Sequence, residues 1–116
     1  MSLKTYSVKI GGAERELFYG VNALSAIQKE LGENPVKIIT SGFSPLDFNT
    51  VRIILWAGLL HSARKITPEI VGDWMDKKET PYAKLVEISI AAVSDSCNMV
   101  CEFGTEEDEE EEPGKN

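Results

Sequence analysis

Hydrophobic and polar residues alternate at the beginning of the chain and then change to a helical period. Tyr6, Val8 and Ile10 fall on one side of an extended segment, and the run ERELFY follows the pair Gly11-Gly12. Two glycines supply the positive backbone angles that a tight turn requires, so this pattern predicts a β-hairpin. A hairpin alone is only marginally stable, so we expect helices to pack on its apolar face.

Helical spacing begins directly after the hairpin. Four apolar residues recur at this spacing, and a glycine that can end a helix in a left-handed turn follows them: Val21, Leu24, Ile27, Leu31 and Gly32. Pro35 then indicates a short helical segment that closes near Ser41-Gly42.

The segment Ile53–Leu60, IILWAGLL, is apolar around its whole circumference, which is typical of a central, buried helix. We expect this helix to begin with Ser44 as its cap and Pro45 at its first position, with Asn49 as a rival cap. Gly58 costs about 1 kcal/mol relative to alanine inside a helix, and close approach of another helix would offset that cost.

Two more helices are predicted where threonine precedes proline, because this pair caps and opens a helix. Thr67-Pro68 opens a helix with the apolar residues Ile70, Val71, Trp74 and Met75. Thr80-Pro81 opens a longer one with the stripe Tyr82, Leu85, Val86, Ile90, Val93 and Cys97. The predicted fold is α+β: an N-terminal β-hairpin packed on a mainly α-helical bundle of about four helices.

The net charge of −7 belongs to the end of the chain. Seven of the 19 acidic residues lie in Glu106–Glu112, so the other 12 acids balance the 12 basic residues. We predict one globular domain over residues 1–104 and an acidic, disordered tail over 105–116. Three roles are open for this tail: it keeps the protein soluble, it contacts a basic partner, or it binds calcium. The neutral body lacks the clustered cations that bind nucleic acid, and no apolar run is long enough to span a bilayer.

The chain offers few groups for catalysis or metal binding. His61 as a general base would need an orienting acid, but Asp73 and Asp76 lie on another predicted helix. We instead expect His61 in the last turn of the central helix, where imidazole can meet free carbonyl groups. Cys97 and Cys101 share a helix face and, with His61, fall one short of a closed zinc site, so packed thiols in a reducing compartment are expected. No catalytic residue, cofactor or metal is predicted.

Two long stretches carry a resemblance to a known family. They read KTYSVKIGGAERELFYGVNALSAIQKELG and, later, FSPLDFNTVRIILWAGLLHSARKITPEIVGDWMD. In this combination the chain resembles the phage tail assembly chaperones of long-tailed siphophages and related prophages of Gram-positive bacteria, over most of residues 4–103.

The resemblance implies a non-catalytic protein of the bacterial host cytoplasm that is absent from the mature virion. Such a protein binds the tape-measure protein, keeps it soluble and recruits subunits of the major tail-tube protein; self-association is compatible with this role. An alternative is a structural tail component that stays in the virion, such as a terminator or connector. Trp56 and Trp74 lie in apolar stripes and so serve either the core or a partner. The expected partner-binding residues are Leu55, Trp56, Leu59, Leu60, Val71, Trp74 and Met75.

Overall fold

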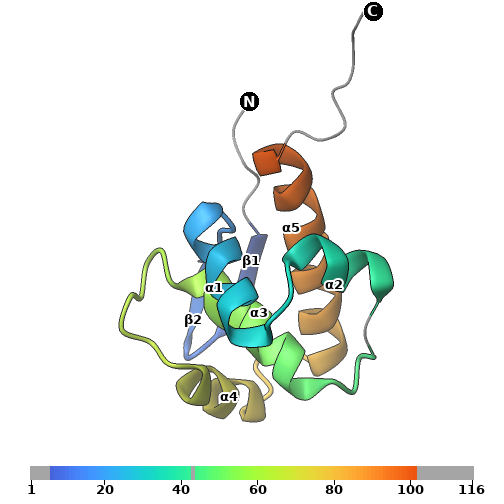
Figure 1. Cartoon of the computed structure of the whole chain (residues 1–116). Coiled ribbons are helices and arrows are strands. Elements are labelled where there is room, and N and C mark those ends of the chain that lie inside the picture. Colours follow the sequence, from blue (N-terminus) through green and yellow to red (C-terminus); the bar gives the residue numbers. More distant parts are fainter. Residues whose placement is uncertain (1–5, 43, 102–116) are drawn as a thin grey trace, which may run out of the picture.

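The computed structural model describes residues 6–42 and 44–101 and confirms the α+β fold. A two-stranded sheet of β1 (Tyr6–Ile10) and β2 (Ala13–Leu17) precedes the helices (Figure 1). In chain order these helices are α1 (Val21–Leu31), α2 (Pro35–Ser41), α3 (Phe48–Leu59), α4 (Pro68–Asp76) and α5 (Tyr82–Cys101). The tail predicted at 105–116 lies outside the described residues, as do 102–104.

The hairpin forms as the alternating pattern predicted. β1 and β2 pair antiparallel, with Ile10 opposite Ala13 across the turn. Gly11 and Gly12 have φ angles of 66° and 80°, a region that side-chain-bearing residues rarely adopt. Because side chains alternate along a strand, one face of this hairpin is buried against the helices, through Val8, Ile10 and Leu17.

Most helix ends follow the predicted signals. Gly32 ends α1 with a φ of 76°, Pro35 opens α2, and Thr67 Oγ1 accepts a hydrogen bond from the Ile70 amide at the start of α4. The Asn34 side chain, which the sequence analysis did not name, caps α2. The prediction for α5 was wrong in one respect. Thr80 Oγ1 donates to the Lys9 carbonyl at 2.7 Å, so it attaches β1 instead of capping the helix.

The predicted start of α3 was also wrong. The helix begins at Phe48, and the Asp47 carboxylate accepts from the Thr50 amide at 3.3 Å. Ser44 is used in a local turn of its own, where its hydroxyl accepts from the Leu46 amide at 3.0 Å. Neither Ser44 nor Asn49 caps the helix, because the cap that engages the first-turn amide is Asp47.

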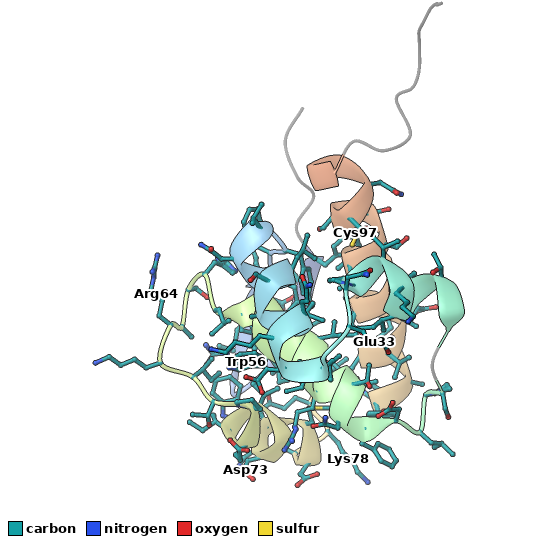
Figure 2. All side chains as sticks on the ribbon, in the orientation of Figure 1. Glu33, Trp56, Arg64, Asp73, Lys78 and Cys97 are labelled. Carbon is teal, nitrogen blue, oxygen red and sulfur yellow. The ribbon has the colours of Figure 1, made fainter. Side chains whose placement is uncertain are left out.

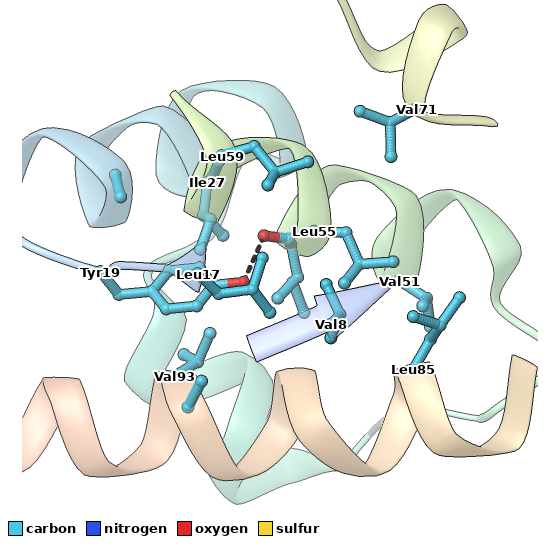
Figure 3. Close-up of a cluster of buried hydrophobic side chains, with 14 of the residues drawn as sticks. Val8, Leu17, Tyr19, Ile27, Val51, Leu55, Leu59, Val71, Leu85 and Val93 are labelled. Atoms are coloured by element: carbon cyan, nitrogen blue, oxygen red, sulfur yellow. Dashed lines mark hydrogen bonds between the residues drawn. The ribbon is translucent and has the colours of Figure 1, made fainter. Parts of the chain in front are cut away.

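Helix α3 is the centre of the packing, as its apolar circumference predicted. It contacts α1, α4, α5 and β2, and Figure 1 shows it in the middle of the molecule. Figure 3 shows buried side chains from the strands and from several helices converging on it. Those on α3 itself include Val51, Ile54, Leu55 and Leu59.

Tyr19 joins the end of the hairpin to α3. Its hydroxyl donates to the Ile54 carbonyl at 2.6 Å in a fully buried position, drawn as the dashed line in Figure 3. The neighbouring amide of Phe18 donates to the Gly58 carbonyl at 2.9 Å. A Cβ on Gly58 would lie 2.6 Å from the Tyr19 ring. The group that approaches this glycine closely is therefore a tyrosine side chain, whereas we expected another helix.

We predict that Gly58→Ala destabilises the protein although alanine favours a helix by about 1 kcal/mol. The new methyl group collides with the Tyr19 ring, so we expect a net loss of about 1–3 kcal/mol in the free energy of unfolding. Urea unfolding followed by circular dichroism measures it. Gly72→Ala in α4 is the matched control, because its Cβ meets only the flexible Arg52 stem at 3.2 Å. Equal stability of the two variants would contradict this packing.

We also predict that stability falls above pH 10. Burial raises the pKa of Tyr19 above its ordinary value of 10.0, so the folded state keeps a proton that the unfolded state releases. Rising pH therefore favours unfolding, by about 1.4 kcal/mol per pH unit for this one group. The pKa values of Tyr6, hydrogen-bonded to Asp95, and of Tyr82 are raised too and act in the same direction. Tyr19→Phe should weaken the slope; an unchanged slope would contradict the assignment to Tyr19.

Candidate functional site

His61 serves to connect two elements of the fold. It lies in the turn after α3, which ends at Leu59, and not in the last turn of the helix as we expected. Its Nε2 lies 2.9 Å from the carbonyl oxygen of Glu16 in β2, and its ring contacts Phe18 edge-on, with ring centroids 5.6 Å apart. The imidazole thus holds the end of β2 against the turn.

Metal-ligating groups do not gather in the part of the chain that the structure describes. Among residues 6–42 and 44–101, no three of His, Cys, Asp and Glu come close enough to hold a metal ion. Cys97 is buried in the core, and the side chain of Cys101 lies outside the described side chains.

The seven predicted partner-binding residues divide into two groups. Leu55, Leu59 and Val71 are at most 1% exposed and belong to the core, so their side chains contact this protein itself (Figure 3). The other four are only partly buried: Trp56, Leu60, Trp74 and Met75. The structure therefore narrows the accessible part of the predicted set to these four.

Both tryptophans have structural contacts. Trp56 Nε1 donates to the Ile66 carbonyl at 2.9 Å and so fixes the loop before α4. Trp74 covers the hairpin turn, because a Cβ on Gly11 would lie 2.6 Å from the Trp74 ring. The Arg15 guanidinium lies 4.5 Å from the centroid of the same ring. A polar residue at either tryptophan would disturb the fold as well as any partner surface.

Two surface grooves flank the ends of α3. The groove at its C-terminal end, the His61 groove, has a volume of about 490 Å³ and is lined by residues that include Phe18, Val21, Ala57, Leu60, His61 and Arg64. Arg64 projects outward from the loop between α3 and α4 (Figure 2). Leu60 is the predicted residue that this groove contains.

The groove at the N-terminal end of α3, the Arg52 groove, is about 520 Å³ and lies between α3, α4 and the start of α5. Asp76 and Lys78 also line it, and Lys78 lies beside α4 at the lower end of Figure 2. Met75 is the predicted residue in this groove. Its other walls are formed by Phe48, Arg52, Gly72, Pro81 and Tyr82.

Phe48, which lines the Arg52 groove, and Leu46 are among the most exposed large apolar side chains, together with Val21, which is 67% exposed and lines the His61 groove. Phe48 is 59% exposed and Leu46, two residues earlier, is 73% exposed. The rings of Phe48 and Tyr82 contact each other with centroids 5.3 Å apart, and the Tyr82 hydroxyl donates to the Pro45 carbonyl. Adjacent exposed apolar side chains are typical of a protein–protein contact surface.

Arg52 is only partly satisfied by its surroundings. Its Nη2 donates to Asn49 Oδ1 at 2.8 Å, whereas its buried Nε has no acceptor among the described residues. A buried donor without an acceptor costs about 1–3 kcal/mol. The ion pairs of the described residues are Lys37–Glu33 and Lys84–Glu87, so Arg52 has no carboxylate within 4.0 Å there.

The sequence pattern did not identify Leu46, Phe48 or Arg52 as surface groups of interest. Phe48 lies outside the apolar run Ile53–Leu60 on which the prediction of the central helix rests. Phe48 is the first residue of α3 and is exposed, whereas Thr50 and Val51 in the same turn are buried.

Comparison with known proteins adds no relative. No family model matches the chain, and neither the curated proteins nor the solved structures contain a match. None of the helices that the structure describes has both the length and the apolar character needed to cross a bilayer.

We predict that the exposed part of this surface tolerates polar residues without loss of the fold. Phe48→Ser should change the free energy of unfolding by about 0.5 kcal/mol or less, as is usual for exposed positions. Leu55→Ala, in the core, should cost about 2–5 kcal/mol. Chemical denaturation measures both. A Phe48→Ser variant as unstable as Leu55→Ala would place Phe48 in the core instead.

Proposed function

We propose that this protein is a phage or prophage tail assembly chaperone that binds the tape-measure protein and keeps it soluble. In this role it recruits subunits of the major tail-tube protein and acts in the bacterial host cytoplasm without becoming part of the virion. The proposal rests on the resemblance of the two stretches quoted above and on one surface feature. That feature is the Arg52 groove, with Phe48 exposed in its lining and Leu46 exposed two residues earlier in the chain.

The groove suits a helical partner on physical grounds. A tape-measure protein is long and helical, and its apolar stripes need shielding until the tail tube encloses them. An amphipathic helix binds by placing its apolar face in a hydrophobic groove. Phe48 and Tyr82 offer aromatic surface for such a face, and Met75 adapts to irregular partners because its side chain is flexible.

The proposed role is binding without catalysis. His61 contacts a backbone carbonyl, and the acidic residues of α4 are not hydrogen-bonded to it in the described structure. Many copies, each covering one segment of an extended partner, would give strong total binding from weak single contacts. Self-association of the chaperone would increase this effect.

The alternative is a tail terminator or connector that stays in the virion. Such a protein would also present an apolar surface, since it must bind other tail proteins. Mass spectrometry of purified phage particles distinguishes the two roles, because a chaperone is absent from the particle and a terminator or connector is present.

We predict that co-expression with the tape-measure protein of the same genome makes that protein soluble and that the two co-purify. Phe48→Ser combined with Leu46→Ser should reduce the recovered complex at least tenfold, because it removes apolar contacts from the edge of the groove. The amount of tape-measure protein in the soluble fraction, compared by immunoblot, measures this.

Val36→Ser on α2 is the matched control, because Val36 is also an exposed apolar side chain but does not line the Arg52 groove. It should leave the yield unchanged. If the tape-measure protein precipitates alone beside the folded wild-type chain, the proposed chaperone function is wrong and the virion component is favoured.

A further inference from the structure

We infer that the Arg52 groove selects a partner helix that carries a carboxylate among its apolar residues, with Arg52 as the group that binds it. This inference rests on the proposed function and names the chemistry of the segment that the chaperone recognises. The occupant is therefore an amphipathic helix of the tape-measure protein in which an aspartate or glutamate interrupts the apolar stripe.

The first argument is the unused binding capacity of Arg52. A guanidinium group carries five N–H donors in a fixed plane, and the described residues supply one acceptor, Asn49 Oδ1. Nε is closed to solvent, so the capacity open to a partner rests on the Nη1 and Nη2 donors. Asp76, which lines the same groove, forms no ion pair with Arg52. The groove thus contains a cation that the described part of the chain leaves without a counter-charge.

The second argument is that Arg52 is already held in place. Its stem lies against α4 at Gly72, where the position of a Cβ would be 3.2 Å from Cδ and 3.8 Å from Nη1. Asn49 Oδ1 accepts a hydrogen bond from Nη2 at 2.8 Å and adds a second contact. A group held in its binding geometry loses little freedom when a ligand arrives, and the planar fork of arginine matches a carboxylate through two parallel hydrogen bonds.

The third argument is the apolar wall around this cation. Phe48, Met75 and Tyr82 line the groove together with Arg52. A helix that covers these residues excludes water from the guanidinium, and an ion pair is stronger in such a low-dielectric setting. A partner without a carboxylate would instead bury the positive charge unpaired, which is unfavourable, so the groove discriminates against purely apolar helices.

The acidic run of this chain, Glu106–Glu112, is a poorer occupant. Its seven adjacent acids bring no apolar side chain to cover Phe48 and Met75, and Asp76 at the groove would repel them. A helix with a single carboxylate flanked by apolar residues would pair with Arg52 and also cover the apolar side chains that line the groove. The charge of the site, with Arg52 and Lys78 against Asp76, also favours one negative group.

The test is a double-mutant cycle with the full-length protein. Overlapping peptides of about 20 residues, each long enough to form a helix of about 30 Å, are taken from the tape-measure protein, and the tightest binder is identified by fluorescence anisotropy. Its acidic residue is changed to the matching amide, and Arg52 is changed to Met, which keeps the stem and removes the charge.

We expect each change alone to weaken binding at least tenfold, and the two together to weaken it no more than either one. Arg52→Lys should recover only part of the affinity, because lysine keeps the charge but lacks the planar fork. Independent losses that multiply would overturn the inference, as would a tightest peptide that contains no acidic residue.

The free protein provides a second readout. If Arg52 serves a partner, Arg52→Met should leave the thermal midpoint of unfolding unchanged or raise it, because it removes a buried donor that has no acceptor. A clear fall of the midpoint would show that Arg52 is structural and would overturn the inference.

Failure of this inference is distinguishable from failure of the proposed function. If Arg52→Met still co-purifies with the tape-measure protein at the wild-type level, the chaperone function stands and the recognition chemistry is wrong. If no peptide binds the wild-type chain and the tape-measure protein stays insoluble, both the inference and the proposed function are wrong.

Sedimentation of the free chain tests whether a second copy occupies the groove. If the free chain is a dimer and Phe48→Ser makes it monomeric, the groove is a contact between two copies, and the inference is overturned.

Discussion

The contact between Tyr19 and α3 is the interaction on which the rest of the structure depends. The ring fills the space left by the missing side chain of Gly58, and the hydroxyl donates to the Ile54 carbonyl. A two-stranded hairpin is marginal by itself, so its stability comes from this attachment and from the burial of its apolar face. Side-chain hydrogen bonds from His61 and Thr80 to the carbonyls of β2 and β1 complete the attachment at both strands.

Enclosure of α3 by other elements determines where a partner can bind. The middle of α3 is covered by α1, α4, α5 and β2, so most of its side chains there pack in the core. Arg52 and Trp56 are the partly exposed side chains within the helix, and each end of α3 borders a groove. The groove at the N-terminal end has the more apolar surroundings and contains the incompletely satisfied Arg52, and for that reason the proposed recognition is placed there.

Local rules predicted the elements well, but they did not separate buried from accessible side chains in the predicted site. Gly11, Gly12, Gly32, Asn34 and Thr67 act through neighbours within a few residues, and such signals can be read directly from spacing. Ser44, Asn49 and Thr80 are also residue types that cap helices, but distant or competing hydrogen bonds decide their use. Among the predicted partner residues, Leu55, Leu59 and Val71 are in the core, whereas Phe48 is exposed. Periodicity identifies an apolar side chain but not what covers it.

The sequence by itself determined the α+β class, the hairpin turn, the central position of α3 and the concentration of negative charge in 106–112. These properties depend on backbone preferences, on hydrophobic period and on composition, all of which are local. Only the tertiary structure decided that Tyr19 occupies the space at Gly58, that Trp74 covers the turn at Gly11, and that Arg52 lies in an apolar groove with a donor unsatisfied. These features arise where residues far apart in the chain meet, and their contacts depend on how helices of fixed shape pack around a shared core.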